Sequence, residues 1–394
     1  MDLEQRHTRG RSMTKQSDEV LATLGDLVSI NSINPAYENG VPEEGVAKYF
    51  ESFFRERGIE TFRQHVMPGR ANIIARLSGR NPGRRIVMEA HMDTASITGM
   101  TIPPFEPTVN NGLLYGRGSC DTKAGLAAMM HAIAELKENS VTPPCEVWLA
   151  AAVDEEYMFR GVVALCEGLQ AHAAIVAEPT ELRAIIASKG VLRWKVRVRG
   201  KAAHSSKPHL GVNAISHMAK IIAALDREAE SLGKKTHPLL GPGTLNVGVI
   251  RGGVQVNFVP DVCEIEIDRR LLPGETPESV LKHHEGILNE LRSQNPSMQI
   301  ETDRPMLADP ALETEASAQV SRVASEILTH LGLNGELAGV PYGSDASKLS
   351  RHGVPSIIFG PGSIDRAHAA VEYVECDQVV SAVSFYREFL LRFE

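Results

Sequence analysis

The sequence predicts an α/β protein that has a mixed, mostly parallel sheet flanked by helices and a smaller α+β domain inserted into it. In the first half of the 394-residue chain, apolar strands alternate with helical segments, which is typical of a parallel sheet covered by helices. Between residues 188 and 302 the order changes to β-α-β-β-α-β, which indicates a ferredoxin-like split βαβ unit. The first pattern then resumes. We therefore expect a main domain of residues 1–187 and 303–394 and an inserted domain of residues 188–302.

The first part of the main domain alternates between two kinds of hydrophobic pattern. Apolar residues recur at helical spacing in some segments and form short continuous or alternating runs in others, as strands do. Ser17 precedes the first helical segment and could cap it. The expected helices are residues 18–30, 42–58, 125–138 and 162–169, and the expected strands are residues 61–67, 71–79, 84–93, 144–156 and 173–180.

The inserted domain opens with a cleanly alternating strand, VLRWKVRVRG. Its apolar residues alternate with basic ones, so the strand has one face for a core and one for solvent. The other strands expected here are residues 244–253, 262–272 and 298–304, and the helices are residues 213–232 and 276–293. The main domain resumes with a helix at 313–328, a strand at 355–360 and a final helix at 376–393.

Composition excludes several classes of protein. The apolar fraction of 43% is normal for a globular protein with a sizeable core. The net charge of −8 argues against a nucleic-acid-binding surface and against a basic membrane patch. No apolar run approaches the roughly 20 residues that span a membrane.

The first residues are polar and lack the apolar core of a signal peptide. Met13 is an alternative start, in which case residues 1–12 form a disordered tail. The five cysteines are odd in number and show no CxxC spacing, so the sequence indicates neither a disulfide framework nor a thiolate zinc site. We expect reduced thiols and a cytoplasmic location.

Six residues with metal-binding side chains lie in distinctive local contexts, most of them at the ends of predicted strands. The carboxyl ends of strands are where an open α/β sheet builds its active site. The mixture of imidazole nitrogens and carboxylate oxygens suits two zinc-like ions bridged by a carboxylate, and it predicts metal-assisted hydrolysis. These residues are His91, Asp121, Glu155, Glu156, Glu178 and His368.

His91 and Asp93 lie two apart at the end of one predicted strand. Residues i and i+2 of a strand face the same side, so Asp93 could hydrogen-bond the ring nitrogen of His91 that faces away from a metal. The alternative is an ordinary histidine at a strand end followed by a turn-forming aspartate.

The acidic run Asp154, Glu155 and Glu156 ends an apolar strand. Neighbouring strand residues point to opposite faces, so one glutamate could bind metal while the other acts as a general base. Three acids at a buried strand end are costly unless a cation offsets them. Asp121 could also be a simple helix N-cap, and Glu178 and His368 could be surface turn residues.

The motifs HMDTAS, GRGSCDTKAG, DEE, EPT and GPGSIDRAH, in this order, resemble the M20 family of dinuclear metallohydrolases. The resemblance covers essentially the whole chain. It implies a zinc-peptidase-like catalytic domain with an inserted lid and dimerisation domain. It further implies two divalent metal ions, Zn²⁺ in the first place and Co²⁺ or Mn²⁺ as alternatives, and a cis peptide bond after Asp121.

The resemblance assigns a role to each strand-end residue. A hydroxide that bridges the two metals is the expected nucleophile, and three ligand carboxylates with this hydroxide would balance the four metal charges. The implied roles are His91 and Glu178 on the first metal, Asp121 as bridge, Glu156 and His368 on the second metal, Asp93 as the partner of His91, and Glu155 as general base and acid.

The resemblance also extends to substrate-binding positions. His204, in GKAAHSSKPHLGVNA, resembles a residue that stabilises the tetrahedral oxyanion, across a dimer interface. Asn257 and Arg270 match positions that hold substrate carboxylate or carbonyl groups, with Arg269 as the alternative to Arg270. Further implied substrate contacts are Gly343 and Ser344, whereas His283, His284 and Glu285 are expected to lie on a solvated helix surface.

The function these features predict is that of a cytoplasmic metallohydrolase acting on linear amides. The favoured substrate is an N-acyl amino acid, N-acetylornithine, as in arginine biosynthesis. The alternatives are a succinyl-diaminopimelate desuccinylase, a metallo-dipeptidase or carboxypeptidase, and a non-catalytic binding protein on the same fold. The expected partners are the small-molecule substrate and a second copy of the chain through the inserted domain, with neither nucleic acid nor membrane.

Overall fold

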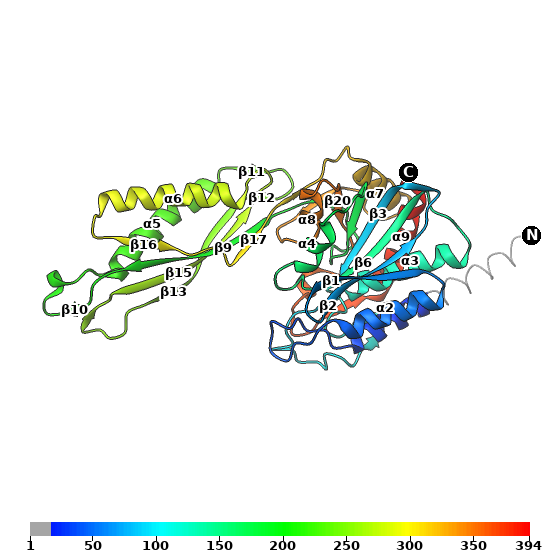
Figure 1. Cartoon of the computed structure of the whole chain (residues 1–394), viewed down its shortest axis with the longest axis horizontal. Helices are drawn as coiled ribbons and strands as arrows, with labels where there is room; N and C mark the ends of the chain where they lie inside the picture. Colours follow the sequence, from blue (N-terminus) through cyan, green and yellow to red (C-terminus); the bar gives the residue numbers. More distant parts are fainter. Residues whose placement is uncertain (1–16) are drawn as a thin grey trace, which may run out of the picture. The chain divides into compact units, whose positions relative to one another are not determined.

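The structure, a computed structural model, describes residues 17–394, which fold into two compact units (Figure 1). The first comprises the described residues up to Ile186, together with Thr314–Ala338 and Ser344–Glu394. The second comprises Ala187–Glu313 and Gly339–Gly343. The tail predicted for residues 1–12 lies outside the described residues.

A nine-stranded mixed sheet forms the centre of the first unit. Its middle strands pair in parallel in the order β6-β3-β7-β20, and the strands on either side of them pair antiparallel. The predicted α/β class with a largely parallel central sheet is therefore confirmed. In spatial order the strands are β1 (Glu60–Met67), β2 (Arg70–Leu77), β6 (Cys145–Ala152), β3 (Asn81–His91), β7 (Ala173–Val176), β20 (Ser356–Ile358), β8 (Ile185–Ser188) and β18 (Leu312–Glu313), and β19 (Ala338–Val340) pairs with β8.

Helices cover the central sheet and bury its alternating side chains. On β3, Ile86, Met88 and Ala90 enter the main core, so the alternate residues Val87 and Glu89 face the opposite side. Helix α3 packs against β3 and α9, while α8 packs against β20 and β7. The helices of this unit are residues 17–29, α2 (Glu44–Glu56), α3 (Lys123–Glu138), α4 (Arg160–Cys166), α7 (Gln319–His330), α8 (Ala346–Arg351) and α9 (Cys376–Arg392).

The second unit is an antiparallel sheet with two helices. Its strand order, β13-β15-β9-β16, combined with the chain order β-α-β-β-α-β, is the arrangement of a split βαβ unit. The interval predicted from the sequence, 188–302, lies inside this unit, which continues to Glu313 because β17 also pairs with β9. The elements are β9 (Gly190–Arg199), α5 (Ala214–Leu232), β13 (Thr244–Gly252), β15 (Val262–Leu271), α6 (Pro277–Gln294), β16 (Gln299–Thr302) and β17 (Leu307–Asp309).

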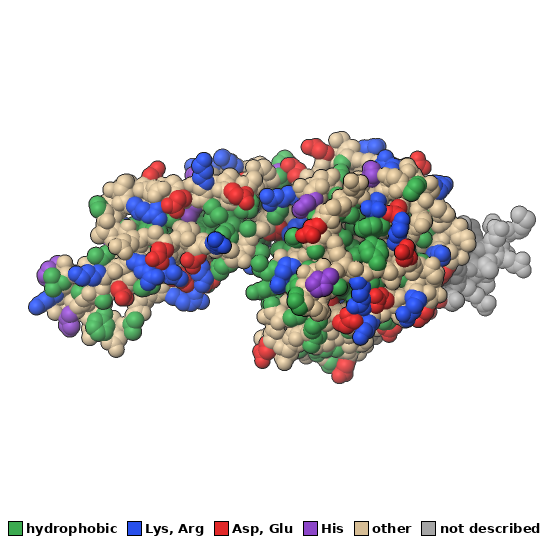
Figure 2. All heavy atoms as spheres, in the orientation of Figure 1, with side chains coloured by type: hydrophobic (Ala, Val, Ile, Leu, Met, Phe, Trp, Pro, Cys, Tyr) green, Lys and Arg blue, Asp and Glu red, His purple; other side chains and the backbone are tan. Residues whose placement is uncertain are grey.

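The alternation of β9 separates the two faces of this sheet. Trp194 and Val196 are fully buried in the core formed with α5 and α6. Lys195 and Arg197, which point to the other face, form ion pairs with Glu264 of β15 at 3.4 and 2.6 Å. Charged side chains of both signs are visible along this unit in Figure 2. The basic side chains on this face of β9 are thus largely neutralised by acids on neighbouring strands.

Short elements complete the two units. In the first unit, β21 (Tyr373–Glu375), β5 (Leu113–Tyr115) and β4 (Thr108–Asn110) form a three-stranded sheet, and the 3₁₀ turn η2 spans Ile364–Arg366. In the second unit, β10 (Ala203–His204) pairs with β14 (Phe258–Val259), β11 (Thr236–His237) pairs with β12 (Gly241–Pro242), and the 3₁₀ turn η1 spans Pro208–Leu210.

Two expectations from the sequence were wrong. The helix predicted to begin at residue 313 begins at Gln319, because Glu313 pairs with β8 and the Thr314 hydroxyl donates to the Ser356 carbonyl at 2.5 Å. His284, predicted to be solvated, is only 3% exposed and contacts the edge of Trp194, with ring centroids 5.1 Å apart.

Among the described residues, no helix is long and apolar enough to cross a membrane. The five cysteines are all free thiols, and all are buried.

Candidate dinuclear metal centre

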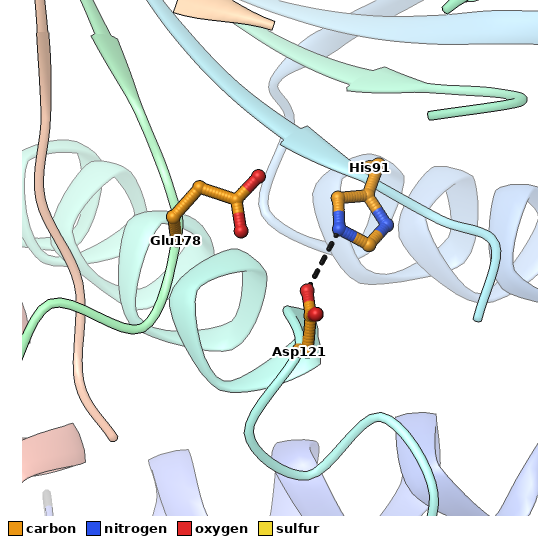
Figure 3. Close-up of side chains that lie close together, drawn as sticks. All are labelled: His91, Asp121 and Glu178. Atoms are coloured by element: carbon orange, nitrogen blue, oxygen red, sulfur yellow. Dashed lines mark hydrogen bonds and ion pairs between the residues drawn. The ribbon is translucent and has the colours of Figure 1, made fainter. Parts of the chain in front are cut away.

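Two groups of three side chains meet in the first unit and share Asp121. One group is His91, Asp121 and Glu178; the other is Asp121, Glu156 and His368. Within each group, one potential ligand atom from each residue lies within 4.8 Å of those of the other two. Figure 3 shows the first group, in which the Glu178 carboxylate and the His91 ring converge on Asp121 from different elements.

The topology of the sheet explains this convergence. His91 is the last residue of β3, and Glu178 follows β7 by two residues. Glu156 follows β6, and His368 comes after β20 and η2. Because the carboxyl ends of neighbouring parallel strands open at one edge, residues from distant parts of the sequence are brought together there.

Asp121 lies at the turn that leads into α3 and contacts both histidines. Its Oδ1 is 3.0 Å from Nε2 of His91, and its Oδ2 is 3.3 Å from Nε2 of His368. The peptide bond from Asp121 to Thr122 is cis, as the resemblance implied. The two oxygens of this carboxylate therefore face different groups, which is the arrangement that a bridging ligand needs.

The partner of His91 differs in detail from the sequence prediction. Nδ1 of His91 is 2.9 Å from the main-chain oxygen of Asp93, whereas the Asp93 carboxylate is 3.9 Å away. Asp93 thus fixes the ring through its backbone carbonyl, which makes Nδ1 a hydrogen-bond donor and turns Nε2 toward Asp121.

The Asp93 carboxylate instead holds the segment that carries the two glutamates. Its Oδ1 accepts the amide hydrogen of Glu155 and its Oδ2 that of Glu156, both at 3.1 Å. Asn34 donates to Asp93 at 2.7 Å and to Asp154 at 3.1 Å, and so joins two buried acids. Sequence reasoning missed Asn34 because an asparagine before proline in a loop is an ordinary turn signal.

Asp154 stabilises the same segment from a left-handed backbone conformation, with φ of +71°. Its carboxylate accepts hydrogen bonds from Arg70 at 2.9 Å and Arg160 at 2.5 Å. Arg70 is in turn paired with the buried Glu43. Two arginines therefore offset the charge of an acid that does not itself belong to the metal-ligand groups.

The ionisation of the cluster reflects its burial. Burial raises the pKa of Glu155 and of Glu178 well above the usual range, and neighbouring carboxylates raise both further. Hydrogen bonds to Asp121 and Glu156 raise the pKa of His368 to about 11. Burial alone would raise the pKa of Asp121, but the hydrogen bonds from His368 and His91 outweigh it and hold the pKa below the usual value. The two histidines thus favour the charged form of Asp121, whereas burial disfavours the charged forms of Glu155 and Glu178.

These donors fit two divalent cations. Two atoms bound to one Zn²⁺ at about 2 Å each are at most about 4 Å apart, which is close to the size of both groups. Imidazole and carboxylate together suit zinc, cobalt and manganese. Cations would also offset the mutual repulsion that raises the carboxyl pKa values. His91, Glu178, Asp121, Glu156 and His368 are the residues that would hold them.

The residues of the second unit that were predicted to bind substrate differ in their exposure and in their ion-pair partners. His204 is exposed on β10, where the Asn257 carbonyl accepts from the Ser205 amide at 3.0 Å. Arg270 is partly exposed and donates to Asp268 at 3.0 Å. Arg269, the alternative, is buried against Glu275 at 2.6 Å, so its guanidinium is already committed. Arg270 is thus the more exposed of the two guanidinium groups.

The two predicted loop residues are tightly packed. A Cβ added to Gly343 would lie 2.3 Å from the Asp309 carboxylate, so close packing explains glycine there. Ser344 is fully buried, and its hydroxyl accepts the Ala346 amide at 3.3 Å at the start of α8. The structure gives the Ser344 side chain a local partner rather than an exposed position.

Comparison with known proteins identifies relatives along most of the chain. The family described as peptidase family M20/M25/M40 matches residues 87–392. Acetylornithine deacetylase of Myxococcus xanthus is 31% identical over 371 residues, covering 91% of this chain and 93% of the relative. N-formyl-4-amino-5-aminomethyl-2-methylpyrimidine deformylase of Bacillus subtilis (strain 168) is 26% identical and covers 97% and 96%. A Staphylococcus aureus (strain N315) protein named probable succinyl-diaminopimelate desuccinylase is 28% identical and covers 96% and 98%.

Solved structures share the fold. Aminopeptidase PepT from Bacillus cereus ATCC 10987 superimposes with a TM-score of 0.78 at 24% identity, covering 95% of this chain and 98% of that one. The YXEP protein of Bacillus subtilis, described as a dinuclear metal binding peptidase, gives 0.74 at 17% identity and covers 97% and 100%. At these identities the likeness concerns the fold alone.

Proposed function

The chain belongs to peptidase family M20/M25/M40, and from this premise we propose that it is a metal-dependent hydrolase that cleaves the amide bond of an N-acyl amino acid. The observation that carries the proposal is the pair of ligand groups that share Asp121. It joins two imidazoles and three carboxylates in one cluster, buried at His91, Asp121 and Glu178 and open to solvent at His368, which a non-catalytic scaffold has no reason to keep together.

The chemistry divides between the metals and the chain. Bound divalent cations would polarise the scissile carbonyl and acidify water at neutral pH. Glu155 lies three residues after the end of β6, beside the proposed ligand Glu156, and its main-chain amide is held by Asp93. The raised pKa of its carboxyl suits a group that takes a proton from the attacking water and delivers it to the departing amine.

For the substrate we favour N-acetylornithine. In support, the acetylornithine deacetylase of Myxococcus xanthus is 31% identical along nearly the whole chain. The deformylase and desuccinylase names among the other relatives indicate that the acyl group varies on this scaffold. A desuccinylase and a dipeptidase or carboxypeptidase therefore remain the alternative substrate assignments.

The test is to purify the full chain, remove metal with a chelator, and restore Zn²⁺, Co²⁺ or Mn²⁺ separately. N-acetylornithine, N-succinyl-diaminopimelate, an N-formyl amine and a dipeptide are then assayed side by side. We expect two equivalents of metal to restore activity, with N-acetylornithine turned over fastest. Full activity of the chelated protein, or no amidase activity with any metal, would rule the proposal out.

The residues of the second unit and of the 343–344 loop keep their proposed roles in substrate binding. His204 is exposed and Arg270 partly so, and Arg270 offers the planar fork that matches a carboxylate. Arg270→Lys is expected to raise KM more than it lowers kcat, whereas His204→Asn, if His204 stabilises an oxyanion, is expected to lower kcat. If both variants have the kcat and KM of the wild-type protein, neither residue belongs to the substrate site.

We also propose that two copies of the chain pair through the second unit in the cytoplasm. Val254 and Val256 are 91% and 100% exposed, and Phe258 nearby is 47% exposed. These residues lie beside β13, an edge strand of the sheet. An exposed apolar group next to an unpaired strand edge is a surface that a second copy can cover.

A further inference from the structure

A buried carboxylate outside the ligand groups holds the turn that presents Asp121. Oε1 of Glu372 accepts three main-chain amide hydrogens, from Gly118 at 3.1 Å, Cys120 at 3.0 Å and Asp121 at 3.0 Å. Its Oε2 accepts from Arg117 at 2.6 Å. Glu372 is 0% exposed and Arg117 is 2% exposed. A buried carboxylate with four hydrogen-bond donors around it is well satisfied, so the turn is fixed to it rather than merely near it.

The position of Glu372 in the chain joins two parts of the metal centre. It lies four residues after His368, and its own carbonyl accepts the Gly116 amide at 3.2 Å. Between them, the carbonyl of Ala370 accepts from the Thr101 amide at 2.9 Å. The segment that carries His368 is therefore anchored on the turn that carries Asp121, and Glu372 is the side chain that links them.

The two ligand groups depend on this link to different degrees. His91 and Glu178 are 2% and 5% exposed, and they extend from strands in the middle of the sheet. The side chain of His368 is 56% exposed, and its backbone has a φ of +57° in a loop. Without the anchor at Glu372, the strands would still hold two members of the first group, whereas the second group would lose the support of both Asp121 and His368.

We propose that Glu372 is a positioning residue for the dinuclear centre, and that it acts mainly on the site formed by Asp121, Glu156 and His368. This inference rests on the proposed metal-dependent function. Glu372 belongs to neither ligand group. Its carboxylate accepts hydrogen bonds from the main-chain amides of the turn. The two oxygens of the Asp121 carboxylate therefore stay directed toward the other members of the two ligand groups.

The experiment is a calorimetric titration of the metal-free, full-length chain with Zn²⁺ alone. Glu372→Gln keeps the shape of the side chain but removes its charge, which weakens the hydrogen bonds from the turn and leaves Arg117 with the Ser96 carbonyl but without its carboxylate partner. We expect wild-type protein to bind two equivalents. In the variant, the weaker equivalent should lose about ten- to a hundred-fold in affinity, while the tighter one changes by less than about three-fold.

Two further variants separate positioning from general stability. Glu146→Gln removes another buried carboxylate, 3% exposed and paired with Arg76 and Arg85 at the opposite end of β6. It should lower the midpoint of thermal unfolding and leave both Zn²⁺ affinities intact. Glu372→Asp keeps the charge but shortens the side chain, so it should also lower the affinity for the weaker equivalent. It provides the same test if the Glu372→Gln variant fails to fold.

The outcomes are distinguishable. Selective loss of the second equivalent in a Glu372 variant supports the inference. Unchanged affinities, or equal weakening of both equivalents in step with the loss of thermal stability, overturn it while the proposed function stands. Wild-type protein that binds no Zn²⁺ overturns the proposed function and this inference together.

Discussion

The burial of His284 makes the stability of the second unit depend on pH. Its ring is 3% exposed and contacts Trp194, and burial lowers its pKa from 6.5 to about 4. Above pH 6.5 the ring is neutral in both the folded and the unfolded chain. As the pH falls below 6.5, the unfolded chain takes up a proton that the folded chain does not, so the free energy of unfolding decreases.

The size of the effect follows from the pKa difference. Between 6.5 and about 4 it amounts to at most about 3 kcal/mol, of which about 1.4 kcal/mol is lost by a pH of about 5.5. The His284→Gln variant cannot take up this proton. Between a pH of about 7.5 and about 5.5, its free energy of unfolding should therefore fall by about 1.4 kcal/mol less than that of the wild-type protein. His283→Gln is the matched control, since His283 is the adjacent residue and its side chain is 61% exposed.

The assay is urea unfolding followed by the fluorescence of Trp194, in a Trp148→Phe background so that the second unit alone is observed. The chain has two tryptophans, and Trp148 belongs to the first unit. If wild-type protein and the His284→Gln variant lose the same free energy of unfolding on acidification, the ring is not held neutral by burial and the reasoning fails. A change of the same size in the His283→Gln control would contradict it equally.

Three further outcomes are expected. Glu155→Gln should lower turnover by about 10²- to 10⁴-fold with two metal equivalents retained, and normal turnover would remove Glu155 as the proton carrier. Lys123→Met removes the buried ammonium that donates to the carbonyls of Leu27 at 2.9 Å and Ile30 at 2.8 Å, and should cost about 1–3 kcal/mol in urea unfolding at neutral pH. Val256→Glu should convert a dimer into a monomer in sedimentation, whereas Val109→Glu, an exposed site in the first unit, should not.

The sequence was informative where the decisive signal is local. A histidine or acid at the end of an apolar strand, such as His91 or Glu178, is visible without a structure because strand ends in an α/β sheet converge. The alternation of apolar and basic residues around Trp194 likewise predicted that one face of this strand is buried. Each of these inferences needs only a short window of sequence and one rule of geometry.

Contacts between distant segments could not be predicted in the same way. Asn34 meets Asp93 across 59 residues, and Glu372 meets the turn at Gly118 across 254. Neither residue has a local pattern that distinguishes it from a polar loop residue. The burial of His284 could not be predicted for a related reason. It depends on contact with Trp194, which is distant in sequence and packs against the inner side of α6, the helix that carries His284.

The metal centre is organised by two carboxylates that bind backbone rather than metal. Asp93 takes the amide hydrogens of Glu155 and Glu156, and Glu372 takes that of Asp121. An acid in a loop commonly folds back onto nearby amides. With those amides already occupied, the carboxylates of Asp121, Glu155 and Glu156 do not fold back onto them, and the repulsion among these carboxylates remains for cations to relieve. We therefore expect the acids that hold this backbone to affect metal affinity, although they lie outside both ligand groups.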